Sequence, residues 1–359
     1  MTDRQSRYFV PGPTWVRPEI LAEMTRPMMG HRSAEFREVF RRVKGDLKSL
    51  FRTTQDAFVS TSSGTGVLEG ALLNVVPRRV LVTTCGAFSE RWKTIAEQTG
   101  VEVDHLDHPW GEAIDPERLA THFAGRRHHY DAVTITHNET STGVMNDLRA
   151  LVEVIHAETS DTLILVDAVS SLGSAPILFD EWGIDVCIAS TQKGLALPPG
   201  LAVFAVSERA LAAAKKKPYR GTYFDFLEYK RQGDNDGAPF TPSIPHYFAL
   251  EKQLDHILRE ETLDERWERH RKMRDMTLER TAGYAELMSD RTHASVSVSA
   301  LRPTKRDAQT ILSEMRARGF VLGGGYGRWK EESFRIGHMG DISLVALSAM
   351  LDVLEEAAQ

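Results

Sequence analysis

Between residues 57 and 207, short apolar runs alternate with longer segments in which apolar residues recur at helical spacing. Runs such as VLVTT at 80–84 and LILVD at 163–167 have the length of buried strands, whereas FSERWKTIAEQ at 88–98 has the length of a helix. Strands that alternate with helices predict βαβ units and a mostly parallel sheet with helices on both faces. The sequence therefore predicts an α/β fold in which ligands bind at the carboxyl ends of the strands.

The segments outside this pattern predict the domain organisation. Residues 1–20 are expected to form an extended N-terminal arm, because prolines interrupt any helix there. Residues 21–250 are expected to form a large α/β domain, and residues 251–359 a linking helix and a small α+β domain. Within these parts we expect a helix over 264–288 and, at 215–245, a long loop that is either functional or an inter-subunit segment.

Charge and hydropathy argue against two classes of protein. The net charge of -6 is negative, whereas a nucleic-acid-binding surface is positively charged. No apolar run is long enough to span a bilayer. The two cysteines, Cys85 and Cys187, lie in strand-like runs, where buried thiols in a reducing compartment are the simplest interpretation. We therefore expect a cytoplasmic protein, and no motif indicates a metal site.

A cluster of small residues, SSGTG at 62–66, lies between an expected strand and an expected helix. The main-chain N–H groups around Ser63 and Gly64, the hydroxyl of Thr65 and the helix N-terminus together favour an anion such as phosphate. The loop matches neither the GxGxxG dinucleotide motif nor the Walker phosphate loop. A plain strand-to-helix turn with a hydroxyl cap explains these residues equally well.

Asp167 and Lys193 follow two of the apolar runs and should reach the same edge of the sheet. A salt bridge between them is the simpler interpretation. In the alternative, Asp167 holds the protonated ring nitrogen of pyridoxal phosphate and Lys193 carries this cofactor as a Schiff base. The loop at 62–66 would then bind the phosphate of the cofactor.

Three further segments place aromatic or charged groups near strand ends. Phe88 follows a strand and either stacks on a planar ring or packs in the core. The segment HNETSTG at 137–143 crowds polar groups, Thr140 among them, although an ordinary polar loop also accounts for it. Arg335 lies in the strand-like FRIGHMG at 334–340, where its guanidinium must pair with a carboxylate of either a substrate or the protein.

The order of these motifs resembles that of the class V aminotransferases of the fold-type I pyridoxal-phosphate superfamily, and most of all the alanine–glyoxylate and serine–glyoxylate aminotransferases. The resemblance covers nearly the whole chain and rests on PGPT, SSGTGVLEGAL, CGAFSERW, THNETSTGV, LILVDAVSSLG, WGIDVCIASTQKGLALPPGL, PFTPSIPHYFAL and FRIGHMG. It implies a large domain with a mostly parallel seven-stranded-type sheet and a smaller C-terminal α+β domain.

The resemblance also implies which residues hold the cofactor ring. Lys193 would be the Schiff-base lysine, and Asp167 the partner of the pyridine nitrogen. Phe88 and Val169 would lie on opposite faces of the ring, and Thr140 near its phenolic oxygen.

For the phosphate and the substrate, the resemblance implies a second group of residues. Gln192 would contact the phosphate together with the 62–66 loop. Arg335 would receive the α-carboxylate of the substrate, in a pocket bordered by Gly12 of the arm. His31 or Arg32 would reach the mouth of that pocket, unless they belong to a surface turn.

In the family the active site is completed across a homodimer. Thr241 matches a threonine that reaches the phosphate in the second subunit. Ala238 stands where some members carry a tyrosine with a similar reach, so this sequence departs from the pattern there. The candidates to replace it lie in the 215–245 loop: Tyr219, Tyr223 and Tyr229.

The function implied is that of a pyridoxal-phosphate-dependent aminotransferase with ping-pong kinetics. It would move an amino group from a small amino acid of the alanine or serine type to a 2-oxo acid such as glyoxylate or pyruvate. A transaminase of 2-aminoethylphosphonate is an alternative, because an arginine also binds a phosphonate. A lyase such as a cysteine desulfurase would need an exposed nucleophilic cysteine, and nothing in the sequence supports a non-catalytic binding protein.

Overall fold

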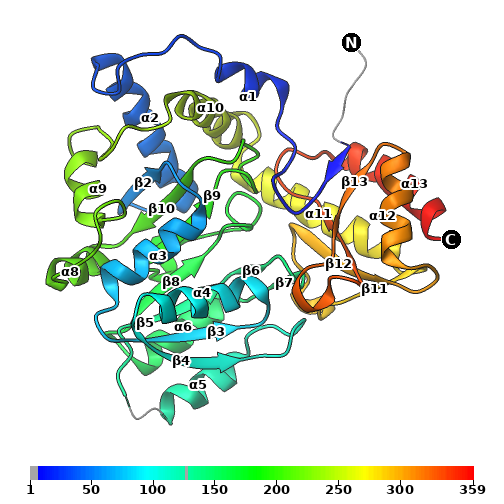
Figure 1. The fold of residues 1–359 in the computed structure, drawn as a ribbon, viewed down its shortest axis with the longest axis horizontal. Coiled ribbons are helices and arrows are strands. Elements are labelled where there is room, and N and C mark those ends of the chain that lie inside the picture. The colour runs from blue at the N-terminus through cyan, green and yellow to red at the C-terminus, as the bar shows by residue number, and fades with distance from the viewer. Residues whose placement is uncertain (1–6, 126–127) are drawn as a thin grey trace.

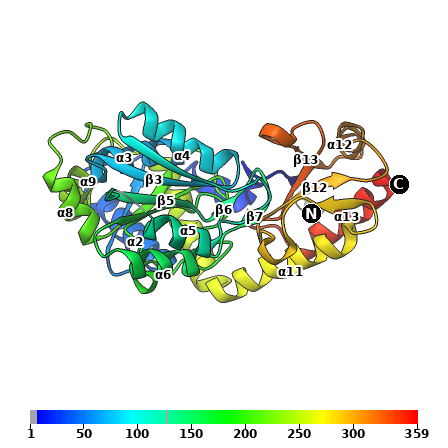
Figure 2. The ribbon, with the colours of Figure 1, turned by 90° about the horizontal axis from the view of Figure 1, so that it is seen from below.

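The structure, a computed structural model, describes residues 7–125 and 128–359. These residues form a large domain around a seven-stranded sheet and a small domain around a five-stranded sheet (Figure 1). This architecture confirms the predicted α/β fold with a smaller C-terminal α+β domain. The two domains lie side by side, and helix α11, Leu263–Thr281, runs from one to the other (Figures 1 and 2).

The large sheet has the strand order β2-β10-β9-β8-β5-β3-β4, and β10 alone is antiparallel to its neighbours. Its strands are mostly buried apolar runs, which is typical of a parallel sheet covered on both faces. Their bounds are β2 Asp56–Ser60, β3 Arg79–Thr84, β4 Glu102–Asp107, β5 Ala132–Thr136, β8 Leu163–Asp167, β9 Val186–Ser190 and β10 Ala202–Val206.

Two apolar cores lie on opposite faces of this sheet, because successive residues of a strand point to opposite sides. In β8, for example, Leu165 belongs to one core and Val166 to the other. The first face is covered by α2 Ala34–Phe51, α5 Pro116–Ala124, α6 Leu148–Glu158 and α10 Ile244–Asp255. The second is covered by α3 Gly64–Val75, α4 Ala87–Gln98, α8 Glu208–Lys216 and α9 Phe226–Gly233.

The small domain has the strand order β1-β13-β14-β12-β11. Its first strand comes from the N-terminal arm, where Tyr8 pairs with Val321 and Phe9 with Leu322 in parallel register. The bounds are β1 Tyr8–Phe9, β11 Ala285–Leu287, β12 Val298–Pro303, β13 Val321–Gly324, β14 Phe334–Gly337, α12 Ala308–Ala317 and α13 Leu344–Ala358. Phe9 is fully buried among the apolar residues of α12 and α13, so the arm is part of this core.

The remaining elements are short. They are α1 Pro18–Glu23, the hairpin β6 Asn138–Glu139 and β7 Val144–Met145, α7 Phe179–Trp182, the π-helical turn His256–Glu260, and the 3₁₀ turns Arg291–His293 and Gly327–Trp329.

Three local expectations from the sequence are wrong. The arm contains the short helix α1, which Pro18 begins at a position where a missing N–H costs nothing. The expected loop at 215–245 contains α9, which Asp225 caps by accepting a hydrogen bond from Leu227. The expected helix over 264–288 ends at Thr281, and Ala285–Leu287 instead pairs with β12 as a strand.

A buried charge network joins the two domains. Arg266 of α11 is fully buried and donates to Glu261, to Asp341 and to the main-chain carbonyl of Gly194. Asp341, in the small domain, also accepts from Arg17 of the arm at 2.9 Å. Because a buried charge is tolerated only when it is paired, this network fixes α11 against both the arm and the segment after Lys193.

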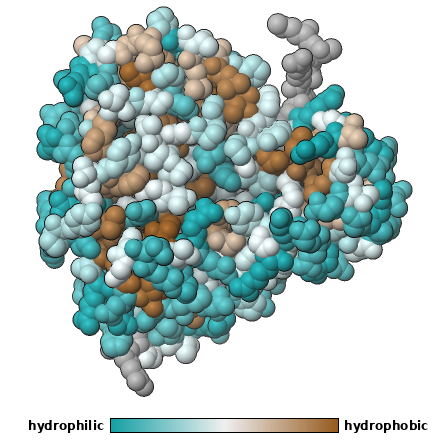
Figure 3. All heavy atoms as spheres, in the orientation of Figure 1, coloured by the Kyte–Doolittle hydropathy of each residue, from teal (hydrophilic) through white to brown (hydrophobic). Residues whose placement is uncertain are grey.

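Two surface properties bear on the setting of the protein. In the part of the chain that the structure describes, no helix is both long and apolar enough to cross a membrane. The face seen in Figure 3 carries separate apolar patches over the large domain, whereas the outer side of the small domain is mainly hydrophilic.

Candidate active site

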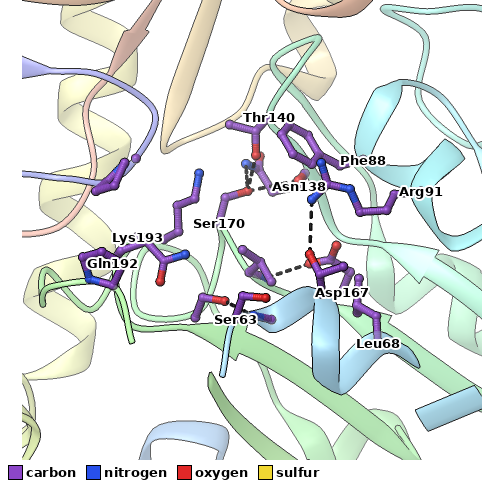
Figure 4. A pocket seen from close by; sticks show the side chains of 17 residues that line it. Ser63, Leu68, Phe88, Arg91, Asn138, Thr140, Asp167, Ser170, Gln192 and Lys193 are labelled. Carbon is purple, nitrogen blue, oxygen red and sulfur yellow. Dashed lines mark hydrogen bonds between the residues drawn. The ribbon is translucent and has the colours of Figure 1, made fainter. Parts of the chain in front are cut away.

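A cavity of about 230 Å³ lies at the carboxyl ends of the strands of the large sheet (Figure 4). Lys193 and Gln192 approach it from one side, and Phe88 and Arg91 from the opposite side (Figure 4). The lining residues are Gly12, Pro13, Ser63, Gly64, Thr65, Leu68, Phe88, Arg91, Asn138, Thr140, Asp167, Val169, Ser170, Ser190, Gln192, Lys193 and Pro199.

The register of the sheet explains why the acid and the lysine meet. Thr136 at the end of β5 pairs with Asp167 at the end of β8, and Asp167 pairs with Ile188 of β9. Strands β5 and β8 therefore end at the same level, whereas β9 continues past Ile188 to Ser190, and residues that follow all three strands line one cavity. This confirms the prediction that Asp167 and Lys193 arrive at the same edge of the sheet.

Asp167 is a buried carboxyl group that forms no ion pair with any residue that the structure describes, although the charges of Arg91 and Lys193 act on it. Its Oδ1 accepts a hydrogen bond of 2.8 Å from the main-chain N–H of Val169, and it forms no ion pair with Lys193. The simple salt bridge between the two is thus absent. Burial raises the pKa of Asp167 to about 6, because a charged carboxylate loses its hydration there.

Lys193 is held by the N-terminal arm. Its Nζ donates a hydrogen bond to the main-chain carbonyl of Pro11. Gly12 is the next residue, with φ +106, and a Cβ there would lie 2.6 Å from Nζ of Lys193, so only glycine fits. Burial, followed by the charge of Arg335, lowers the pKa of Lys193 to about 8.

The loop at 62–66 forms the N-terminus of α3 within the cavity. Ser63 occupies the N-cap position, but its side chain makes no capping hydrogen bond, and the N–H of Gly64 donates to Ser190 Oγ at 2.9 Å. A Cβ at Gly64 would lie 2.5 Å from that oxygen, so the backbone approaches β9 closely. Thr65 also lines the cavity, with its hydroxyl 3.3 Å from Arg91 Nη1.

Two buried amide oxygens of the lining residues have no hydrogen-bond partner in the part of the chain that the structure describes. They are Oε1 of Gln192 and Oδ1 of Asn138. A buried acceptor without a partner is costly, so both atoms favour a ligand or water that donates to them.

Phe88 lines the cavity and is half-buried, one residue after the first residue of α4. Its ring stacks on that of Tyr326, with the centroids 5.2 Å apart and the planes at 18°. The guanidinium of Arg91 lies 4.9 Å from the centroid of the same ring. Sequence reasoning missed Arg91, although its spacing of three residues from Phe88 on one helix was a signal.

Glu139 is a second residue that the sequence indicated only as part of a polar cluster. Its carboxylate is fully buried at the N-terminus of α4, where it accepts from the main-chain N–H groups of Phe88 and Ser89 and from the hydroxyl of Ser141. A negative charge at a helix N-terminus is favourable. Glu139 therefore fixes the backbone that carries Phe88.

Thr140 and Arg335 are brought together from different domains. Thr140 is buried, lines the cavity and donates to Ser170 Oγ at 2.7 Å. Arg335 lies behind it and donates to the main-chain carbonyls of Thr140 at 3.1 Å and Gly324 at 2.8 Å. Among the described residues no carboxylate forms an ion pair with Arg335. The protein carboxylate that the sequence offered as its alternative partner is therefore not found.

Thr241 lies away from this cavity. It is exposed and lines a separate cavity of about 540 Å³ together with His31, Arg32 and Ala238. The three loop tyrosines do not line the cavity of Lys193 either: Tyr219 is exposed, Tyr223 donates to the carbonyl of Thr61, and Tyr229 donates to Ser60 Oγ.

Both cysteines are free and buried, as the sequence predicted. Neither lines the cavity, and burial raises the pKa of each thiol, to about 12 for Cys85. A nucleophilic cysteine of the kind a desulfurase needs is therefore not provided by Cys85 or Cys187.

Comparison with known proteins gives the family. The family model described as "Aminotransferase class-V" matches residues 19–325. The chain belongs to the class V aminotransferases. It is 34% identical over 356 residues to a serine–glyoxylate aminotransferase of Methylorubrum extorquens, with 96% of this chain and 88% of that protein covered.

Other proteins to which the chain is similar have different names. The chain is 35% identical over 358 residues to a protein of Synechococcus sp. named "Soluble hydrogenase, small subunit", covering 97% of this chain and 92% of that protein. Among solved structures, an alanine–glyoxylate aminotransferase of Nostoc sp. superposes with a TM-score of 0.92 at 26% identity, covering 100% of this chain and 97% of that one.

Class V aminotransferases use pyridoxal phosphate, and the cavity fits this cofactor. Asp167 has a raised pKa and no ion pair among the described residues, so its carboxylate could pair with a protonated ring nitrogen. Lys193 presents an amine, and the N-terminus of α3 with the unpartnered Gln192 oxygen faces the space where a phosphate and its water would bind.

Proposed function

We propose that this enzyme transfers the amino group of a small amino acid, of the alanine or serine type, to a 2-oxo acid such as glyoxylate or pyruvate. The observation that carries the proposal is the position of Arg335. Its guanidinium has no carboxylate partner among the described residues and lies behind Thr140, which shares a cavity with Lys193 and Asp167. An amino acid bound there would satisfy Arg335 and bring its α-carbon toward Lys193.

The residues of the cavity divide the chemistry between them. Pyridoxal phosphate, when bound, supplies a ring that accepts electrons from the substrate. Lys193 would hold the cofactor, and its amine would take the proton from the substrate α-carbon, for which a pKa of about 8 is well suited. Asp167 keeps the ring nitrogen protonated, since the carboxylate and the cation stabilise each other in a buried site.

The other lining residues position the cofactor in this proposal. Phe88 and Val169 enclose the ring, and Thr140 lies near its phenolic oxygen. Gly12 leaves room for Lys193 to move. The phosphate is held by Gln192 and by the N-terminus of α3, with Ser63, Gly64 and Thr65.

We also propose that the protein is a homodimer with shared active sites. Thr241 is exposed in the single chain and does not reach the cavity of Lys193. A second chain that covers this surface would give Thr241 a place near the phosphate of its partner.

The experiment is to reduce the purified protein with borohydride and to locate the cofactor by peptide mass. It should be attached to Lys193, and alanine or serine with glyoxylate should be converted to the corresponding 2-oxo acid and glycine. Lys193→Ala should abolish both results, whereas Lys216→Ala, on the exposed side of α8, should change neither. A cofactor still covalently attached in Lys193→Ala would contradict the proposal.

A further inference from the structure

Residues 324–330 of the small domain cross to the large domain beside the cavity. Tyr326 stacks on Phe88, Trp329 packs edge-on against Trp110 with centroids 5.6 Å apart, and Arg328 donates to Glu90 at 2.9 Å. Glu90 also accepts from Trp110 Nε1 at 3.0 Å. This crossing segment is thus fixed to the large domain at three points.

Glycines on both sides of Tyr326 set the path of its backbone. A Cβ at Gly325 would lie 2.2 Å from the carbonyl oxygen of Trp329. A Cβ at Gly327, where φ is +57, would lie 2.4 Å from the ring of Trp110. Any larger residue at either position would therefore displace the backbone that places Tyr326 against Phe88.

The same segment orients Arg335. The main-chain carbonyl of Gly324 accepts a hydrogen bond from Arg335 Nε. The centroid of the Tyr326 ring lies 5.3 Å from the guanidinium carbon of Arg335. Tyr326 is still 37% exposed, although it touches both Phe88 and Arg335. The ring of Tyr326 thus contacts both Phe88 and Arg335, which forms no ion pair with any described residue, and part of the ring surface stays exposed.

We propose that Tyr326 is a specificity-determining residue for the amino-acid substrate, an inference that rests on the proposed function. With the α-carboxylate on Arg335, the substrate side chain lies against the free part of the Tyr326 ring. The ring of Tyr326 packs against Phe88, so a larger substrate cannot push it aside. It accepts side chains of one or two heavy atoms and excludes longer ones.

The test compares wild-type holoenzyme with Tyr326→Ala and Tyr326→Phe. Propionate, butyrate and hexanoate carry the carboxylate but no amino group, so they bind without reacting, and calorimetry measures their dissociation constants. Each methylene that a pocket rejects costs about 10-fold or more in specificity. Wild type and Tyr326→Phe should bind propionate at least about 10-fold more tightly than hexanoate, and Tyr326→Ala should remove this preference.

Transamination of alanine, 2-aminobutyrate and norleucine by the same proteins gives the second readout. The ratio of kcat/KM for norleucine to that for alanine should rise about 10-fold or more in Tyr326→Ala and stay unchanged in Tyr326→Phe. Equal losses with every chain length, or an unchanged ratio in Tyr326→Ala, would overturn the role of Tyr326. A wild-type enzyme that transaminates none of the three would overturn the proposed function instead.

Discussion

Asp167 and Lys193 carry opposite charges in water, yet burial moves both toward neutrality in this cavity. The pKa of Asp167 rises to about 6 and that of Lys193 falls to about 8. Perturbed groups of this kind gather at functional sites, where a ligand compensates for the lost hydration. A cationic ring beside Asp167 would stabilise its buried carboxylate, and a covalent bond at Lys193 would remove the cost of burying its charged amine.

The raised pKa of Asp167 predicts how the cofactor-free protein responds to pH. The pKa of Asp167 in the folded protein, about 6, lies above the usual aspartate value of 3.8, so the folded state binds the proton more tightly. Stability from this group therefore falls as pH rises from about 4 to 6, by up to ~3 kcal/mol. Asp167→Asn cannot ionise, and should unfold at higher urea concentration than wild type at pH 8, with a smaller difference at pH 4.5.

Asp307→Asn is the control for this pH experiment. Hydrogen bonds from Thr310 hold the pKa of Asp307 below its usual value, so this carboxylate stabilises the folded state when it is charged. Its replacement should lower stability at pH 8. A wild-type protein more stable than Asp167→Asn at pH 8 would contradict the cost assigned to the buried carboxylate.

For single residues, the sequence predicts a place in the site for those side chains that come directly after a strand. Asp167, Lys193, Phe88 and the 62–66 loop all follow apolar runs, and they line one cavity. Arg91 does not: it lies within a helix, where an arginine usually faces solvent. Its presence in the cavity depends on the angle at which α4 meets the sheet, which no local pattern encodes.

The same limit applies to whole elements. The alternation of strands and helices predicts the large sheet because each of its strands can be recognised locally, as a short apolar run. Strand β11 was expected to be helix, because Ala285, Glu286 and Leu287 are good helix formers. Pairing with β12 overrides this preference, and such pairing between distant residues is not visible in a local window.

Helix α4 depends on one side chain from another element. Glu139 accepts hydrogen bonds from Phe88, Ser89 and Ser141, and both of its oxygens are used. Glu139→Gln would replace one acceptor with an NH₂ group that faces N–H donors. We expect a loss of ~1–3 kcal/mol in the free energy of unfolding, together with weaker cofactor binding because Phe88 loosens.

Urea unfolding and cofactor titration check this prediction about Glu139. The matched control is Glu153→Gln, which removes an exposed ion pair with Arg149. An exposed pair of this type is worth little, so the control should stay within about 0.5 kcal/mol of wild type. Equal effects of the two substitutions would show that the buried carboxylate does not support α4.

At the scale of the whole molecule, the proposed homodimer makes a prediction about complementation. Thr241→Asp would bring a negative charge to the phosphate of the partner subunit, and Lys193→Ala would remove the anchoring amine. Each variant alone should be inactive. A mixed dimer should regain activity, because the Thr241→Asp chain keeps Lys193 and receives an intact Thr241 from the other chain.

Sedimentation velocity and activity after mixed refolding provide the measurement. Wild type should sediment as a dimer, that is, at twice the 40.2 kDa mass of the chain. Thr121→Asp, at an exposed threonine of α5, should remain active alone. An active monomer, or a mixed dimer without activity, would contradict the shared site.

The pairing of β1 with β13 has a consequence for the order in which the chain is synthesised. Tyr8 and Phe9 pair with Val321 and Leu322, and the residues just after them, Pro11 and Gly12, lie against Lys193. While the chain is still growing on the ribosome, its first strand has no partner. The cavity therefore stays unfinished on the side of the arm until β13 has been translated, long after Lys193.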